Sequence, residues 1–369
     1  MTNEVYLKLA EKLDSFPIGV KKKGVDFPPS FLELLEMLYT PEEAKIISHL
    51  EFFLESIPKI AKKINKSKEE TERILNDLAD RGKIFRYKKQ GKLKFAIFNA
   101  ANLFDYPFLQ LETSQKLQKM AELAMNWFGS EFIDEAFGGT KTGIYRVLPV
   151  DEEIKGGGEI LSYETVSGLI RSMKDLTIIP CVCRRRMELI GKKRCNHPVE
   201  ESCITFGNTG LFFQEQGYGR AITVEEALKL LRKYQEDGLI LMTTNSQEKI
   251  LVVCACCDCC CVGLRGLLEF KKPAAVMPAN FQVEIDPDAC VGCGICVERC
   301  VFKANSLIFD ENLNRSIASV DLDRCVGCGL CTITCEGNAR KLVHIKRGEI
   351  PKNFLELGFQ IAKEKEENQ

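Results

Sequence analysis

Apolar residues recur with a helical period in the first hundred residues. Three successive segments show this pattern: 40–54, 58–64 and 67–82. In the third segment, Ile74, Leu75 and Leu78 fall on one face of the expected helix. Apolar and polar residues then alternate on either side of Gln90 and Gly91, along 83–88 and 93–97, as they do in a β-hairpin. The pattern therefore predicts three helices and a hairpin within residues 1–100.

The middle of the chain alternates between helical and strand-like patterns. Amphipathic helices are expected over three segments: 114–128, 163–175 and 223–237. A strand is expected at 250–253, directly before a cysteine-rich segment. The three glycines at 156–158 predict a flexible joint. These patterns divide the region into a helical linker at 101–160 and an α/β domain at 161–280.

Length and composition indicate more than one packed domain. A chain of 369 residues with 45% apolar residues exceeds one ordinary domain, so we expect an α+β multidomain protein. A net charge of −1 gives no general attraction to nucleic acid or to membranes. The first residues lack the layout of a secretory signal, and no apolar run reaches the ~20 residues that span a bilayer. A cytoplasmic location is therefore expected.

The chain contains 18 cysteines, and their interpretation depends on the compartment. In a reducing cytoplasm such a number indicates metal binding rather than disulfides. Several cysteines are also adjacent in sequence, which makes them poor candidates for disulfide pairing. Because so many thiolates are sensitive to oxygen, an anaerobic setting is expected.

Two cysteine runs near the C-terminus share one spacing, C-x-x-C-x-x-C-x-x-x-C. Their members are Cys290, Cys293, Cys296 and Cys300, then Cys325, Cys328, Cys331 and Cys335. A [4Fe–4S] cubane takes three thiolates from a tight turn and a fourth from a more distant segment. Glycines between the cysteines allow the backbone to bend closely around sulfur. Two identical runs therefore predict two [4Fe–4S] clusters.

These runs resemble the bacterial two-cluster ferredoxins, over residues 281–346, and leave 347–369 as a C-terminal tail. The resemblance implies that the fourth cysteine of each run ligates the other cluster. One cluster would then take Cys290, Cys293, Cys296 and Cys335, and the other Cys325, Cys328, Cys331 and Cys300. The proline that usually follows the fourth cysteine is replaced here by Val301 and Glu336, which affects the loop and not the ligands.

Ten further cysteines lie in the domain at 161–280. They are Cys181, Cys183, Cys195 and Cys203, then Cys254, Cys256, Cys257, Cys259, Cys260 and Cys261. The first four equal one ligand set, for either a cubane or a tetrahedral zinc ion. If a strand continues through the second group, Cys254 and Cys256 face one way, and Cys257, Cys259 and Cys261 the other. The segment could then serve two sites.

The cysteine-rich domain resembles that of iron–sulfur proteins from anaerobes, in which Cys-x-Cys-Arg and Cys-Cys-x-Cys-Cys segments precede a two-cluster ferredoxin domain. The resemblance implies redox chemistry and no defined reaction. The neighbouring run Arg184, Arg185 and Arg186 has two interpretations. It is either a solvated surface or a source of positive charge that compensates thiolate ligands.

The N-terminal helices and hairpin resemble a winged-helix domain. The hairpin is basic, but the helix that would enter a DNA groove carries an excess of acidic residues. Carboxylates near phosphates oppose the electrostatic term that dominates DNA affinity. Docking of a protein is therefore favoured over DNA binding for this domain.

The leading hypothesis is an electron-transfer protein with a redox protein partner. Two [4Fe–4S] clusters would exchange single electrons with an additional centre in the cysteine-rich domain, for which an iron–sulfur cluster is favoured over zinc. Whether the protein is itself an oxidoreductase stays open. The alternatives are a redox-sensing winged-helix regulator and a protein that traffics metal or clusters.

Overall fold

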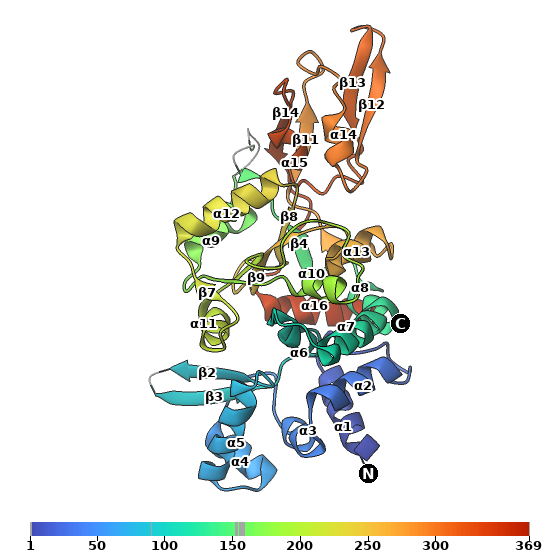
Figure 1. The fold of residues 1–369 in the computed structure, drawn as a ribbon. Helices are drawn as coiled ribbons and strands as arrows, with labels where there is room; N and C mark the ends of the chain where they lie inside the picture. Colours follow the sequence, from blue (N-terminus) through green and yellow to red (C-terminus); the bar gives the residue numbers. More distant parts are fainter. Residues whose placement is uncertain (1, 90, 152–153, 155–158, 369) are drawn as a thin grey trace.

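A computed structural model describes residues 2–89, 91–151, 154 and 159–368, and shows a mixture of helices and sheets (Figure 1). The N-terminal helices lie at the bottom of Figure 1, a mixed sheet lies in the middle, and the C-terminal strands project at the top. The glycines at 156–158 lie outside the described residues. No helix within the described part of the chain is long and apolar enough to cross a membrane.

The N-terminal unit combines five helices with a small sheet. The helices are α1 (Thr2–Asp14), α2 (Pro29–Leu38), α3 (Pro41–Ile47), α4 (Ile57–Ile64) and α5 (Lys68–Asp80). The strands are β1 (Glu55–Ser56), β2 (Phe85–Lys89) and β3 (Lys92–Ala96), paired in the order β1-β3-β2. The Thr40 and Ser67 side chains cap α3 and α5 by accepting hydrogen bonds from backbone N–H groups. Helix α3 is shorter than the predicted 40–54 because a turn begins at Ser48.

The predicted linker at 101–160 is largely part of the core. It forms α6 (Ala100–Asp105), a 3₁₀ turn η1 (Tyr106–Leu109), α7 (Gln115–Trp127), a π-helical turn η2 (Phe128–Phe132) and α8 (Ile133–Phe137). Trp127 at the end of α7 is fully buried and lies against Phe31 of α2 and Phe104 of α6. Its indole N–H donates to the Val20 carbonyl at 3.0 Å. These contacts join the linker to the N-terminal helices.

The cysteine-rich domain is built on a seven-stranded sheet with the order β10-β4-β8-β9-β6-β5-β7. Its strands are β4 (Tyr145–Val147), β5 (Thr177–Ile179), β6 (Cys203–Thr205), β7 (Arg220–Ala221), β8 (Ile240–Thr244), β9 (Val252–Cys256) and β10 (Val276–Met277). Only the pair β10–β4 is parallel. The helices of this domain are α9 (Val166–Ser172), α10 (Val182–Leu189), α11 (Gly207–Glu215), α12 (Val224–Glu236) and α13 (Val262–Leu268).

The C-terminal module contains two antiparallel strand pairs and two short helices. They are β11 (Phe281–Ile285) with β14 (Arg340–His344), β12 (Asn305–Asp310) with β13 (Arg315–Val320), α14 (Ile295–Arg299) and α15 (Leu330–Ile333). The β12–β13 hairpin extends away from the rest of the molecule at the top of Figure 1. The base of the module contacts the central domain, where the Val150 N–H donates to the Cys328 carbonyl at 3.0 Å.

Within the predicted tail, residues Phe354–Glu367 form helix α16, which returns from the C-terminal module to the N-terminal helices (Figure 1). Leu357 and Ile361 on this helix are fully buried. The Glu364 carboxylate accepts hydrogen bonds from Thr142, through both its backbone N–H and its hydroxyl. The segment is thus part of the folded body.

Candidate metal centres

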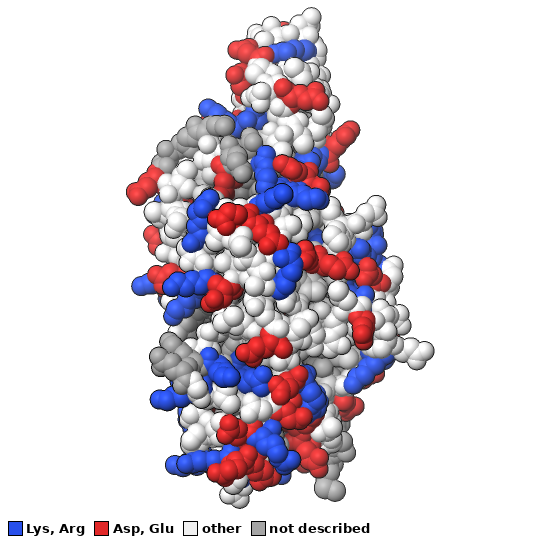
Figure 2. All heavy atoms as spheres, turned by 60° about the vertical axis from the view of Figure 1, so that its left-hand side comes forward, with Lys and Arg blue, Asp and Glu red and all other residues white. Residues whose placement is uncertain are grey.

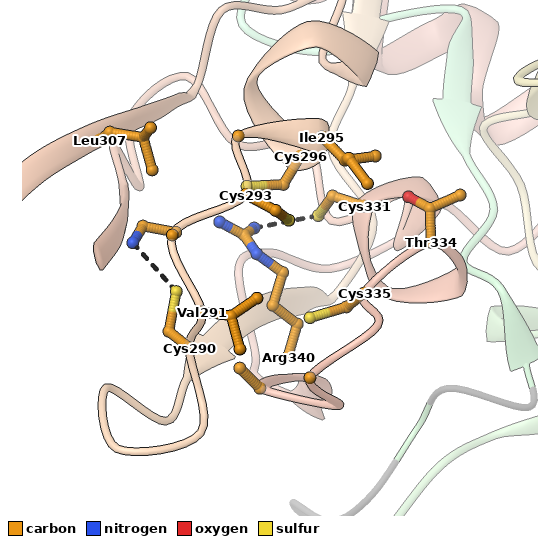
Figure 3. Close-up of a pocket in the computed structure, with 15 residues that line it drawn as sticks. Cys290, Val291, Cys293, Ile295, Cys296, Leu307, Cys331, Thr334, Cys335 and Arg340 are labelled. Carbon is orange, nitrogen blue, oxygen red and sulfur yellow. Dashed lines mark hydrogen bonds between the residues drawn. The ribbon is translucent and has the colours of Figure 1, made fainter. Parts of the chain in front are cut away.

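Five cysteines line a cavity at the outer part of the C-terminal module, which we call the outer cavity (Figure 3). They are Cys290, Cys293, Cys296, Cys331 and Cys335. The loop before α14 closes tightly because Gly292 adopts a φ of 68°. A Cβ atom at this position would lie 2.4 Å from the Ser316 carbonyl oxygen, so the turn needs glycine.

A second cavity, the inner cavity, lies between this module and the central sheet. Its cysteines are Cys300, Cys325, Cys328 and Cys331. Gly327 takes the place that Gly292 has in the first loop, with a Cβ position 2.2 Å from the Phe281 carbonyl oxygen. Cys300 and Cys335 therefore each line the cavity of the other run, and Cys331 lines both cavities. If Cys331 is assigned to the inner cavity, the other cysteines fall into the two groups that the ferredoxin resemblance implies, and the ligand sets stay a prediction.

The thiols of these cavities suit a cluster with several metal ions. Backbone N–H groups point at the sulfurs, from Ala318 to Cys290 at 3.3 Å and from Ala304 to Cys300 at 3.4 Å. Such bonds stabilise thiolate ligands. Among the described residues, no thiol–thiol hydrogen bond joins the eight cysteines.

Arg340 lies between the two cavities. Its side chain is 6% exposed, lines the outer cavity and donates to the Cys331 sulfur of the inner set at 3.2 Å (Figure 3). Burial raises the pKa of Cys331 to about 11, and the guanidinium of Arg340 opposes that rise. Burial likewise raises the pKa of Cys296, again opposed by Arg340. One buried cation thus acts on sulfurs of both sets.

Replacing Arg340 by methionine is expected to lower the reduction potentials in this module, because the added electron would lose a nearby cation and a hydrogen bond to sulfur. The shift should be larger for the inner set, where the hydrogen bond is made. A redox titration followed by electron paramagnetic resonance measures both potentials. Arg315→Met is the control, since Arg315 donates only to the backbone carbonyls of Pro287 and Asp288. Unchanged potentials in Arg340→Met would contradict this role.

A compact group of four thiols forms in the central domain, and we call it the four-cysteine site. It consists of Cys195, Cys257, Cys259 and Cys260, whose sulfurs all lie within 4.8 Å of one another. Cys257 is 3.6 Å from Cys195 and 3.8 Å from Cys259, and Cys259 is 3.4 Å from Cys260. Sulfurs around one tetrahedral ion with a metal–sulfur bond of about 2.3 Å lie about 3.8 Å apart. The site has the dimensions of a single ion.

The other six cysteines of this domain form a second group, the six-cysteine ring. Its members are Cys181, Cys183, Cys203, Cys254, Cys256 and Cys261. The neighbouring Cys181 thiol lowers the pKa of Cys183 and of Cys203. Cys254 also interacts with Cys203, and Cys261 interacts with Cys183 and Cys256. The six thiols are therefore neighbours.

The sequence did not predict this division of the central cysteines. Cys195 stands apart from Cys181, Cys183 and Cys203, which the sequence groups with it as one ligand set. The expectation that 254–261 could face two sites agrees with the geometry for Cys254, Cys256, Cys257 and Cys259. Cys261 joins Cys256 instead of Cys257 because the strand has ended and Cys261 is the residue that precedes α13.

Arg184, Arg185 and Arg186 are buried, with exposures of 1%, 5% and 1%. The solvated-surface interpretation of this run is therefore wrong. Arg186 donates to the Cys183 sulfur at 3.6 Å, pairs with Asp105 and lies over the Phe128 ring. It is held in place by the helical segment that precedes the central sheet.

Arg184 lies between the two groups of central thiols. Its guanidinium donates to the Ser202 hydroxyl at 2.7 Å and to the Ala255 carbonyl. The pKa of Cys257 is lowered to about 5, first by a hydrogen bond from Cys260 and further by the charge of Arg184. Arg184 also helps to lower the pKa of Cys203. Both buried cations thus favour thiolates.

Comparison with known proteins adds one finding. Residues 318–341 match the family model described as a 4Fe-4S binding domain. On the basis of this match, the chain is an iron–sulfur protein. The matched residues contain the whole second cysteine run, from Cys325 to Cys335. No curated protein and no solved structure matches the chain.

Proposed function

We propose that this chain is an electron-transfer protein that works in an anaerobic, reducing cytoplasm. It carries two [4Fe–4S] clusters with crossed ligation, one in each cavity, and exchanges single electrons with metal held by the central cysteines. The proposal is carried by one observation: the outer and inner cavities are adjacent, are both lined by cysteines and are joined by Arg340. When bound, the clusters supply one-electron redox chemistry.

The outer cavity is the side that meets an external redox partner. Cys293 is exposed, whereas no cysteine of the inner set is. Val291 beside it is 59% exposed, and Ile308 and Phe309 on β12 are 49% and 62% exposed. An exposed apolar surface beside an accessible cluster suits brief docking of another protein. Electrons would enter or leave there.

The inner cavity is next to the central cysteines. Ile240 on β8 lines this cavity and pairs directly with Cys256 on β9. Residues directly opposite in an antiparallel pair have Cα atoms roughly 4.5–5.5 Å apart. Arg299 of α14 also donates to the Gln235 carbonyl of α12 at 2.6 Å, which fixes the module on the central domain. These contacts support the proposal that an inner cluster lies beside the six-cysteine ring.

Protein prepared without oxygen is expected to contain about eight iron and eight sulfide ions in the C-terminal module, as two cubanes require. Iron and acid-labile sulfide analysis gives the total. Dithionite reduction should produce two interacting paramagnetic centres in electron paramagnetic resonance. A protein that folds and holds only one cluster after reconstitution would overturn the two-cluster proposal.

The alternative function is a redox sensor whose N-terminal domain binds DNA. One face of the molecule shows basic and acidic side chains interspersed over the N-terminal part, with no large basic area (Figure 2). The hairpin also packs on the central domain, where the ring centroids of Phe85 and Phe212 lie 5.1 Å apart and Arg86 pairs with Glu215. These contacts favour docking within the chain over DNA binding.

The full chain is therefore expected to bind DNA weakly, with no sequence preference and with an affinity that falls steeply as salt rises. Fluorescence anisotropy with random and genomic duplexes at two salt concentrations measures this. Tight, selective binding at physiological salt that changes with cluster oxidation would establish the sensor function instead.

A further inference from the structure

We propose that the six-cysteine ring is a metal site of its own, separate from the four-cysteine site, and that it holds an iron–sulfur cluster with more than one metal ion. This proposal deepens the proposed function, on which it rests. The four-cysteine site would then hold a single ion. The central domain would thus contain two metal centres of different kinds, and the cysteine-rich segment 254–261 would supply ligands to both.

The first support is that the six thiols converge from different elements of the fold. Strand β9 supplies Cys254 and Cys256 on one face, and the register of the sheet places Cys203 of β6 opposite Cys254. Helix α10 begins at Cys181, with Cys183 in its first turn, and Cys261 precedes α13. Two strands and two helix starts therefore converge on one point. Cys183 and Cys254 pack both against the buried cluster that contains Cys181 and Cys203 and against the one that contains Cys256 and Cys261.

The second support is the size of the ring. In the described chain, the four-cysteine site is the one group of three or more such ligands whose atoms all lie within 4.8 Å of one another. Among the described residues the ring thiols do not form such a group, so their spacing does not match that of ligands around one tetrahedral ion. Six sulfurs also exceed the four ligands of a structural zinc ion. An assembly of several ions fits both the spacing and the number.

The third support is the charge around the ring. The Arg186 guanidinium donates to the Cys183 sulfur at 3.6 Å. The backbone N–H of Arg184 donates to the Cys181 sulfur at 3.5 Å, and its guanidinium donates to the hydroxyl of Ser202, the residue before Cys203. Buried cations of this kind are costly unless they face anions. Thiolates that bind metal supply those anions. A ring of neutral, unliganded thiols would leave the arginines with less compensation.

The fourth support is position. Cys256 of the ring is the strand partner of Ile240, which lines the inner cavity. Soft thiolate ligands select zinc, copper(I) and iron–sulfur clusters. Among these, iron–sulfur clusters exchange electrons in single steps at the potentials of the neighbouring module. The location beside a cluster cavity therefore favours iron with inorganic sulfide.

The test compares two matched pairs of substitutions in the full chain, prepared without oxygen. Cys254→Ser with Cys256→Ser changes the ring, and Cys257→Ser with Cys259→Ser changes the four-cysteine site. Iron, zinc, copper and acid-labile sulfide are measured per chain. The ring pair should lose at least two metal ions together with sulfide, and the other pair should lose about one ion and no sulfide.

The parent protein tests the proposed function, which fails only if the cubanes of the C-terminal module are missing from it. The ring is tested separately, by the difference between the variants and the parent protein. A folded ring variant that retains all metal and sulfide would overturn the proposal, as would the loss of one ion without sulfide. Because Cys254 and Cys256 lie within the sheet, Cys261→Ser at the start of α13 is a second variant. Loss of metal and sulfide from this variant supports the ring, and unchanged content counts against it.

Discussion

Replacing Cys335 by alanine is expected to remove the cluster of the outer cavity and to leave the inner cluster in place. Cys335 belongs to the second cysteine run by sequence, yet it lines the cavity of Cys290, Cys293 and Cys296. The variant should retain about half of the iron in the C-terminal module. Electron paramagnetic resonance of the reduced protein should then lose the magnetic coupling between the outer and inner clusters.

The matched control is Cys300→Ala, which should remove the inner cluster instead, because Cys300 lines that cavity. The two variants can be told apart by adding Arg340→Met to each. The reduction potential of the remaining cluster should shift more in the Cys335→Ala background, which retains the inner cluster, because Arg340 donates to Cys331 of that set. The opposite pattern would show that each run ligates its own cluster.

Replacing Arg186 by methionine is expected to destabilise the protein by about 1.5–3 kcal/mol, because it removes the charged hydrogen bonds of a buried guanidinium, whose partner Asp105 is 36% exposed. Arg186 is 1% exposed, pairs with Asp105 and contacts Cys183. Burial already raises the pKa of Asp105 to about 6, against the opposing charge of Arg186. Without the guanidinium, this carboxylate and the nearby thiolate lose their cation. Anaerobic urea unfolding measures the change.

Arg220→Met is the control for Arg186→Met. Arg220 pairs with Glu201 and Glu226, but its side chain is 48% exposed, so its loss should cost about 0–1 kcal/mol. Arg186→Lys keeps the charge and should recover part of the stability. Equal urea midpoints for Arg186→Met and the parent protein would show that the buried pair has no stabilising role.

Local signals in the sequence located several of the helix starts. Ser67, Ser114 and Thr223 each precede a helix and accept a hydrogen bond from its first turn, as their side chains allow. The spacing of the two C-terminal runs likewise predicted which cysteines line a common cavity. Short turns hold three cysteines of each run close together, so little long-range information is needed. These features depend on residues close together in the chain.

The partition of the central cysteines could not be predicted in the same way. Whether Cys203 faces Cys254 or Cys257 depends on the register between β6 and β9, which are separated by two strands in sequence. A shift of one residue would reverse the side on which each thiol lies. The burial of Arg186 depends in turn on Asp105, 81 residues earlier in the chain. Such distant pairings leave no periodic signal in one sequence.

The course of the chain around the C-terminal module makes that module an insertion in topological terms. It leaves the central domain near Asn280 and returns at Ile345, whose N–H donates to the Asn280 carbonyl at 2.9 Å, and α16 then packs beside the N-terminal helices. Neighbouring ends of this kind permit the removal of a whole domain. A short glycine linker could therefore replace the entire C-terminal module, whereas truncation before Phe281 would also remove α16. In the linker variant the metal content of the central cysteines can be measured while α16 still packs beside the N-terminal helices.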